Sequence, residues 1–276
     1  QFPQMSTSAA AELENAIAAA GLTHLAQKYL AKEKMENMCT RFLVARKGDT
    51  TKALKMLQGY LEWCENDQVL AIRHKTASQM LRADTNPESK AFHDKTFIHG
   101  LLGKCYEGRP ILYQKYGKEF CAKKMEDAGF SGKDLEDYYT WMLERALEAM
   151  GHEGTWVVVV DLEGWNLGTH FNMRHIRYVR ACVDRSSKFY PERAGKIFLI
   201  NVPSVFSKCW VLIKPMLDSV TQAKVGLYSA SDDYRSVMAE TLDINLLPQS
   251  LGGSTILTYD SPHSLDPMLH TGPDPT

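Results

Sequence analysis

The amino-acid sequence predicts an α/β fold in which a helical N-terminal lobe packs on a lobe built around a mostly parallel sheet. The first hundred residues show helical periodicity and almost no strand pattern. From residue 109 onward, short apolar runs rich in β-branched residues alternate with helical segments. This alternation is typical of parallel strands joined by right-handed helical crossovers. We therefore expect a helical lobe over residues 1–100, a sheet lobe over residues 101–255 and a C-terminal tail over residues 256–276.

Two amphipathic helices are expected in the helical lobe, at residues 36–46 and 49–64. Their apolar side chains recur at steps of three and four residues, which places them on one face of each helix. These apolar positions are Met38, Phe42 and Ala45 in the first helix and Leu54, Leu57, Leu61 and Cys64 in the second. The turn Lys47-Gly48-Asp49 separates the helices, and either Asp49 or Thr50 can cap the second.

The sheet lobe shows a regular succession of strands and helices. The expected strands are residues 111–116, 155–160, 196–202 and 224–228, and the expected helices are residues 134–150, 172–189, 204–217 and 232–240. Acidic residues open the helix at 134–150, and Gly151 ends it. Four prolines after Ser254 indicate a tail that wraps the surface or stays mobile.

The overall charge argues against recognition of nucleic acid. Lysine and arginine total 32 and aspartate and glutamate total 33, so the net charge is -1. Such a chain has no general field that would gather nucleic acid or an acidic membrane. Any electrostatic recognition must come from a local cluster. The hydrophobic content of 44% is sufficient for a sizeable core.

The cysteines and the hydropathy pattern indicate a cytoplasmic protein. The six cysteines are spread without a C-x-x-C pair, at Cys39, Cys64, Cys105, Cys121, Cys182 and Cys209. We expect reduced thiols. No run of 18 uncharged apolar residues is present, and the alanine-rich residues 9–22 do not resemble a signal peptide. The first residue is Gln1 rather than Met, which leaves open whether a leader was removed.

Common catalytic and cofactor motifs are missing. The sequence contains no G-x-x-x-x-G-K-[ST], G-x-G-x-x-G, G-x-S-x-G or H-E-x-x-H pattern. The nine histidines are scattered, and none stands beside a nucleophile or a second metal ligand at helical spacing. We therefore expect no enzyme activity, no metal site and no catalytic residues.

Three polar residues precede neighbouring strands of the expected sheet. Glu192 stands before the strand at 196–202, and Thr221 and Lys224 stand before the strand at 224–228. If these strands are adjacent, the three side chains lie at one end of the sheet. A carboxylate and a hydroxyl can bind sugar hydroxyls, and a lysine balances an anionic charge. The set suits a polyol phosphate, although Glu192 and Lys224 could also form an ordinary ion pair.

The helix expected at residues 204–217 is apolar on nearly every side. Only Lys208 and Lys214 interrupt its apolar residues, and Pro215 would end or kink it. Such a helix is either fully buried or moves between protein and lipid.

Many short motifs of this chain resemble, in order and at matching spacing, the CRAL-TRIO lipid-binding proteins. The resemblance is strongest to the yeast-type phosphatidylinositol transfer proteins and covers residues 36–253. The motifs that carry it are Arg41-Phe42-Leu43, Ala45-Arg46-Lys47, Glu107-Gly108-Arg109-Pro110, Asp161-Leu162-Glu163-Gly164, Tyr190-Pro191-Glu192-Arg193, Ile200-Asn201-Val202-Pro203, Phe206, Lys214-Pro215, Leu217-Asp218, Thr221 to Lys224, Leu247-Pro248 and Gly252-Gly253.

The resemblance implies a helical lobe packed on a CRAL-TRIO lobe whose sheet floors an apolar lipid pocket. It implies that the inositol headgroup is held by Glu192, Thr221 and Lys224, with Arg46 and Lys47 in support. The helix at 204–217 matches the family's mobile gate. The pocket and gate positions implied are Trp156, Val158, Phe206, Trp210, Ile213 and Met216.

Some positions depart from the family pattern. Phosphatidylcholine-binding relatives carry small hydroxyl side chains where this chain has Trp156 and Val158, which argues against phosphatidylcholine as the second ligand. Gly48 and Leu251 replace residues that are usually aromatic. None of these positions belongs to the implied inositol contacts.

The expected function is therefore binding and transfer of phosphatidylinositol, with a bound phospholipid as ligand and no cofactor. The expected partners are phosphatidylinositol, a second unidentified lipid, a transient membrane surface and a phosphoinositide kinase. Phe206, Trp210 and Ile213 are expected to face the membrane. Two alternatives stay open: a carrier of a tocopherol, retinoid, sterol or fatty acid, and a lipid-sensing module without bulk transfer.

Overall fold

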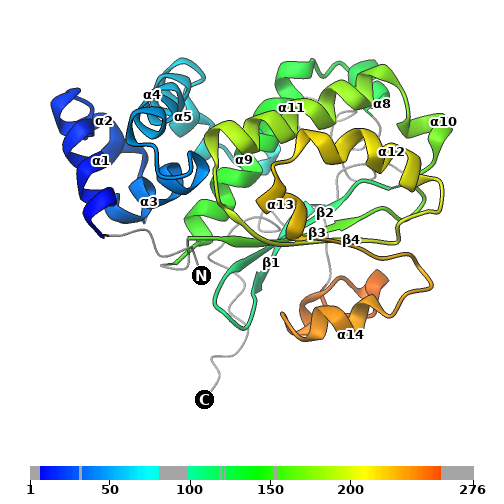
Figure 1. Ribbon diagram of the computed structural model, residues 1–276. Helices are drawn as coiled ribbons and strands as arrows, with labels where there is room; N and C mark the ends of the chain where they lie inside the picture. The colour runs from blue at the N-terminus through cyan, green and yellow to red at the C-terminus, as the bar shows by residue number, and fades with distance from the viewer. Residues whose placement is uncertain are drawn as a thin grey trace.

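The computed structural model describes residues 7–30, 33–80, 99–117, 120, 122–151 and 154–255. Most of the helices lie above a central sheet, and α14 (Tyr234–Ala239) lies below it (Figure 1). The expected tail at 256–276 and the thiol of Cys121 lie outside the described residues. Within the described ranges, every helix is too short or too polar to traverse a bilayer.

The N-terminal part is helical, as the periodicity predicts. Its helices are α1 (Thr7–Ala19), α2 (Thr23–Tyr29), α3 (Met35–Ala45), α4 (Thr50–Asn66), α5 (Val69–Arg73) and α6 (Ala77–Met80). The two expected amphipathic helices are α3 and α4. Asp49 is the cap of α4, because its carboxylate accepts a hydrogen bond from the Lys52 amide at 2.9 Å.

The sheet has five strands in the order β1-β2-β3-β4-β5. The strands are β1 (His99–Lys104), β2 (Pro110–Lys115), β3 (Trp156–Asp161), β4 (Ala194–Ile200) and β5 (Val225–Leu227). The pairs from β2 to β5 are parallel, and β1 pairs with β2 in the antiparallel direction. The mostly parallel sheet is confirmed. The sequence did not predict β1, because the two glycines of HGLLGK weaken a strand pattern.

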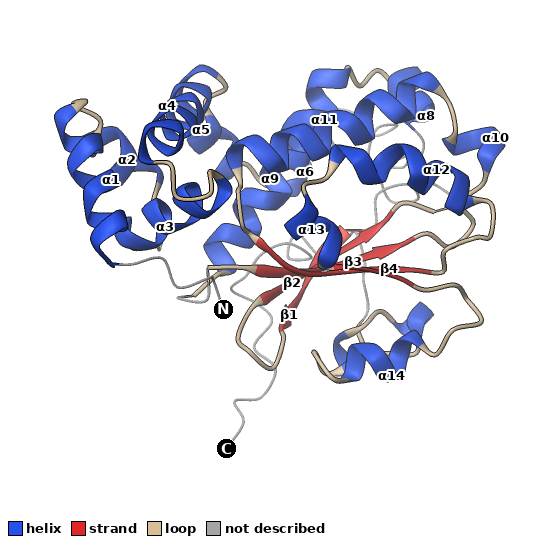
Figure 2. Ribbon diagram, viewed as in Figure 1, coloured by secondary structure: helices blue, strands red, loops and turns tan. Residues whose placement is uncertain are grey.

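Helices cover both faces of the sheet (Figure 2). The remaining elements are α8 (Ala122–Asp127), α9 (Gly132–Ala149), α10 (Leu167–His170), α11 (Met173–Phe189), α12 (Phe206–Ile213), η1 (Lys214–Met216), α13 (Ser219–Ala223), η2 (Ile244–Leu246) and η3 (Gln249–Leu251). One face lies under α9, α11 and α12, and the opposite face packs against α14 and the segment after it. The N-terminal helices join the first layer, where the Trp63 and Phe189 rings stack with centroids 4.1 Å apart.

Alternation along the strands gives the two faces different roles. Val157, Val159 and Phe198 belong to the core beneath α14. Their neighbours Val158, Val160 and Ile197 point to the other face, below α11 and α12. Packed side chains fill only part of the space on that face, and the cavity described below opens there.

Two elements differ from the expectation at the edge of this face. The helix expected at 204–217 is shorter, because α12 ends at Ile213 and a 3₁₀ turn containing Pro215 follows. Lys224 does not begin β5 but caps α13, a five-residue helix that the sequence analysis missed. Asp218 caps this helix, so a short polar turn separates α12 from the strand.

Candidate functional site

A cavity of about 560 Å³ lies between the sheet and the helices above it. This volume falls within the range of small-ligand sites. The floor is formed by β2, β3 and β4, and α11 and α12 form the roof and one wall. All eleven residues assigned to a headgroup, pocket or gate role from the sequence line this one cavity.

Glu192 and Lys224 lie together at the amino end of adjacent strands. Lys224 Nζ is 3.3 Å from Glu192 Oε2, and both side chains are mostly buried. The pairing of β4 with β5 brings the two residues together, as the spacing predicts. In the structure they form an ion pair that faces the cavity.

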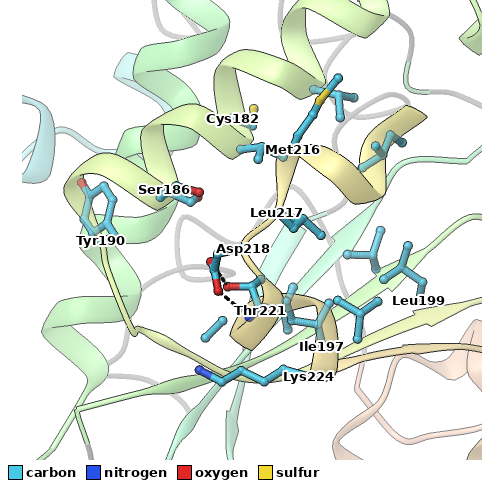
Figure 3. A pocket seen from close by; sticks show the side chains of 18 of the residues that line it. Cys182, Ser186, Tyr190, Ile197, Leu199, Met216, Leu217, Asp218, Thr221 and Lys224 are labelled. Carbon is cyan, nitrogen blue, oxygen red and sulfur yellow. Dashed lines mark hydrogen bonds between the residues drawn. The ribbon is translucent and has the colours of Figure 1, made fainter. Parts of the chain in front are cut away.

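Thr221 has a second partner that the sequence analysis did not foresee. Its hydroxyl donates to Asp218 Oδ2 at 2.7 Å, and its amide donates to Asp218 Oδ1 at 2.8 Å (Figure 3). Thr221 therefore helps to cap α13 while lining the cavity. Its oxygen can still accept a hydrogen bond from a ligand, because a hydroxyl carries two lone pairs.

The same end of the cavity carries an excess of positive charge. Its charged lining residues outside the buried Arg193 ion network are four cations, Arg46, Lys47, Lys188 and Lys224, and two anions, Glu192 and Asp218. Within the described part of the chain, Arg46 and Lys47 make no ion pair. They stand at the end of α3, where Lys47 adopts a left-handed backbone with a φ of 55°. This end suits an anionic group.

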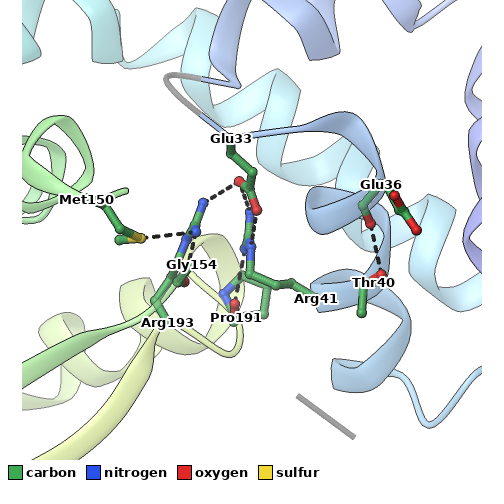
Figure 4. Close-up of polar contacts among 8 residues, drawn as sticks. All are labelled: Glu33, Glu36, Thr40, Arg41, Met150, Gly154, Pro191 and Arg193. Atoms are coloured by element: carbon green, nitrogen blue, oxygen red, sulfur yellow. Dashed lines mark hydrogen bonds and ion pairs between the residues drawn. The ribbon is translucent and has the colours of Figure 1, made fainter. Parts of the chain in front are cut away.

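The backbone of Glu192 is also left-handed, with a φ of 58°. This conformation costs a non-glycine residue roughly 1–2 kcal/mol, so its surroundings must hold it. On one side, Arg41 donates to the carbonyl oxygen of Pro191 at 3.0 Å. On the other, Arg193 donates to the Gly154 carbonyl oxygen at 2.9 Å and pairs with Glu33 (Figure 4).

Glu33 joins these two arginines in one buried ion network. It accepts two hydrogen bonds of 2.8 Å from Arg41 and a further one from Arg193. Burial works to raise the pKa of the Glu33 carboxyl, but the two guanidinium groups outweigh it and hold that pKa below its ordinary value. Glu33 therefore stays ionised.

A second buried network of hydrogen bonds holds the Tyr190 side chain in place. Its hydroxyl donates to Glu144 Oε1 at 2.6 Å, and Arg73 donates to Glu144 Oε2 at 2.6 Å. Tyr190, Pro191 and Arg193 are thus each fixed to helices or loops outside β4. Of the two charged side chains of this turn that line the cavity, Arg193 belongs to the buried ion network, and Glu192 pairs with Lys224.

The apolar wall on the side of α12 differs from the expectation in one respect. Phe206 is 5% exposed and packs against Trp165, with ring centroids 5.3 Å apart. Trp210 and Ile213 also line the cavity. The expectation that these three side chains face a membrane is wrong for Phe206, because the inner face of the helix points inward. Val211 does not line the cavity and is 69% exposed, and Leu212 is 51% exposed at the rim of the cavity.

The far end of the cavity, near the carboxyl ends of β2 and β3, is walled by aromatic rings. Those that line it are Tyr116, Trp165, His170, His175 and Tyr178. Burial, and then the nearby His170, lower the pKa of His175 to about 4. The His175 ring is therefore neutral at neutral pH.

Sequence reasoning missed several lining residues. Asp218 and Lys188 add charge near the headgroup end, and Gln114 adds an amide to the floor. A signal for Gln114 was present, because it falls two residues after Leu112 on the same face of an otherwise apolar strand.

The described residues contain neither a candidate metal centre nor a disulfide. Among them, no group of three or more histidine, cysteine, aspartate or glutamate side chains could hold an ion. The five cysteines within the described ranges are buried free thiols.

Comparison with known proteins gives consistent matches. Residues 94–253 match the family described as "CRAL/TRIO domain". The SEC14 cytosolic factor of Candida glabrata is 27% identical over 232 residues, covering 81% of this chain and 72% of the relative. The phosphatidylinositol/phosphatidylcholine transfer protein SFH12 of Arabidopsis thaliana is 28% identical over 236 residues, covering 79% and 39%. The crystal structure of Sfh5 superposes with a TM-score of 0.62 at 15% identity, covering 87% and 86%.

Proposed function

Because the chain belongs to the CRAL/TRIO family, we propose that it binds phosphatidylinositol in the cavity and transfers it between membranes. The observation that carries this proposal is the joining of a cation-rich end to a long apolar floor within one cavity. The printed names of two relatives, a SEC14 cytosolic factor and a phosphatidylinositol/phosphatidylcholine transfer protein, support it.

The apolar floor and walls lower the barrier to moving a lipid through water. Two acyl chains hold on the order of thirty methylenes, and each costs about 0.8 kcal/mol to expose. A cavity about as apolar as the bilayer makes the exchange of chains nearly neutral. Trp156, Val158 and Leu199 supply this surface on the sheet.

The charged end of the cavity then selects among lipid headgroups. A phosphate left unpaired in a partly dry site would cost several kcal/mol, and Lys224 with Arg46 and Lys47 can pair with it. The Glu192 carboxylate can accept hydrogen bonds from ring hydroxyls, which favours inositol over choline. Trp156 and Val158 offer choline no hydroxyl partner on the floor.

The helix α12 acts as the gate in this proposal. It covers the cavity with Phe206 and Cys209 buried while Val211 and Leu212 stay exposed. Contact of the exposed side chains with lipid would favour an open state, and their return to water would favour the closed one. The protein would then work in the cytoplasm and visit membranes transiently. Delivery to a phosphoinositide kinase is the coupled role that fits such a cargo.

Transfer of labelled phosphatidylinositol between liposomes tests the proposal. The wild-type protein should move the lipid, and Lys224→Ala should lower both pickup and transfer while the circular dichroism spectrum stays unchanged. Lys208→Ala is the matched control, because it removes an exposed lysine of α12 that does not line the cavity. Equal uptake of phosphatidylinositol by Lys224→Ala and wild type would contradict the assignment. Binding without transfer would instead identify a lipid sensor.

A further inference from the structure

A side chain from α13 holds the turn that follows α12. The helix α12 ends at Ile213, and the 3₁₀ turn η1 comes directly after it. The side-chain nitrogen of Gln222 donates to the carbonyl oxygen of Lys214 at 3.0 Å and to that of Leu217 at 2.8 Å. Lys214 is the first residue of η1 and Leu217 is its C-cap, so one amide group bridges the whole turn.

The two partners fix how the Gln222 amide is oriented. A backbone carbonyl oxygen can only accept hydrogen bonds, whereas the nitrogen of a side-chain amide carries two hydrogens. That nitrogen can therefore donate to both carbonyl groups at once. The Lys214 oxygen also accepts a hydrogen bond from the Leu217 amide at 3.1 Å, and its two lone pairs allow both bonds.

The backbone of this turn has few other partners. Pro215 has no amide hydrogen, so the hydrogen-bond ladder of α12 cannot continue through it. The last carbonyl groups of a helix lack partners within the helix and need them from elsewhere. Among the residues that the structure describes, no side chain other than Gln222 forms a hydrogen bond with the backbone of residues 214–217. Gln222 is therefore the side chain that fixes this turn to α13.

The Gln222 side chain acts on the turn and not on the contents of the cavity. Thr221 and Lys224 line the cavity, whereas Gln222 does not. Met216 and Leu217, within and just after the turn, also line it (Figure 3). Any effect of Gln222 on a bound lipid must therefore pass through η1.

Movement of α12 away from the sheet would separate Gln222 from Lys214. The Lys214 amide donates to the carbonyl oxygen of Trp210, so η1 continues α12 and moves with it. Gln222 belongs to α13, which is capped by Lys224, and β5 begins at the next residue. The bond from Gln222 to Lys214 therefore stabilises the closed arrangement. One or two hydrogen bonds of this kind change an equilibrium by about tenfold.

We infer that Gln222 is a positioning residue that holds α12 closed through η1 and so sets how often the cavity opens. It has no part in the choice between lipids. The inference rests on the proposed function only for the role of α12 as the gate. It adds a specific restraint on that gate, placed in the same five-residue helix as Thr221.

Amide hydrogen exchange followed by mass spectrometry tests this restraint without any added lipid. Gln222→Met keeps the length of the side chain but removes both donors. In the full chain, this variant should exchange the amides of residues 206–217 about tenfold faster than wild type, with unchanged exchange in β4. Gln249→Met is the matched control, because Gln249 is an exposed glutamine of another 3₁₀ turn, η3, and does not line the cavity. It should leave the exchange of residues 206–217 at the wild-type rate.

Lipid exchange separates positioning from binding. Gln222→Met should release labelled phosphatidylinositol to acceptor liposomes about tenfold faster than wild type. The ratio of phosphatidylinositol to phosphatidylcholine that it binds at equilibrium from mixed liposomes should equal the wild-type ratio, because no lining residue is changed.

Each outcome decides for or against the inference. Wild-type amide exchange at residues 206–217 in Gln222→Met overturns it. Equally faster exchange in β4 also overturns it, because the variant would then have lost stability in general. A changed lipid ratio would place Gln222 in the headgroup site and reject the positioning role. If wild type takes up no phosphatidylinositol but the variant shows faster amide exchange confined to residues 206–217, the proposed function fails and the restraint on α12 stands.

Discussion

Lys224 Nζ lies 3.3 Å from Glu192 Oε2, so two residues separated by 32 positions in the chain form an ion pair at the entrance of adjacent parallel strands. The pair lines the cavity, and Arg46 and Lys47 bring further positive charge to the same end. A bound phosphate would pair with Lys224 in place of Glu192. The Glu192 carboxylate would then accept hydrogen bonds from the hydroxyls of a sugar ring.

Exchanging the two charges separates a structural ion pair from a headgroup site. Glu192→Lys and Lys224→Glu together restore an opposite-charge pair, so the double variant should unfold at about the wild-type denaturant concentration. It should still take up phosphatidylinositol poorly, because Glu192 and its left-handed backbone no longer present a carboxylate to the ring. Transfer of labelled lipid is the measurement. Full recovery of transfer in the double variant would show that transfer requires only an ion pair at these two positions, whichever residue carries each charge.

Glu33 should matter for stability far more than its position near the N-terminus suggests. Glu33→Gln leaves Arg41 and Arg193 buried without their anion, which should cost about 3–5 kcal/mol of unfolding free energy in urea titrations. Glu36→Gln is the control, since Glu36 is exposed and points away from this network (Figure 4). It should change stability by less than about 0.5 kcal/mol.

The same network should affect lipid selection. The variant Glu33→Gln, studied at a temperature where it is folded, should lose phosphatidylinositol uptake while keeping uptake of an uncharged lipid. The reason is that Arg41 and Arg193 fix the residues on both sides of Glu192. Equal loss of both lipids would instead point to a general loosening of the fold.

Stability should fall as the pH is lowered from about 6.5 towards 4. His175 has a folded-state pKa of about 4, below its ordinary value of 6.5, because its ring is buried. In this window the unfolded chain takes up a proton that the folded chain does not, so acid favours unfolding. The loss should approach roughly 3 kcal/mol across the window. Urea titrations at several pH values should show a weaker dependence in His175→Phe, and an unchanged slope would contradict the prediction.

The outward face of α12 should govern contact with membranes. Val211→Asp places a charge on a side chain that is 69% exposed, so stability should change little. Binding to liposomes should fall by about tenfold, because an inserted valine contributes roughly 1.5 kcal/mol. Tyr106→Asp is the matched control, since Tyr106 is 66% exposed in the β1–β2 turn, away from α12. Liposome co-sedimentation is the measurement, and equal losses in both variants would reject a specific contact face.

The local pattern of the chain was sufficient for most of the secondary structure. The helical spacing of Leu54, Leu57 and Leu61 and the cap at Asp49 place α4 to within two residues, and the expected helix at 172–189 matches α11 to within one residue. β1 was missed because its two glycines weaken the strand pattern, and α13 was missed because it has only five residues. β1 depends on β2, which supplies its hydrogen bonds from the next segment of the chain, and α13 depends on the cap that Asp218 provides.

The sequence by itself determined the α/β class, the family and eleven of the residues that line the cavity, because period, caps and motif spacing are properties of neighbouring positions. Only the tertiary structure decided that Glu33, Arg41 and Arg193 hold the turn of Glu192, and that Phe206 faces inward. The physical reason is that a hydrogen bond, a buried charge and a cavity wall each depend on residues brought together from distant parts of the chain.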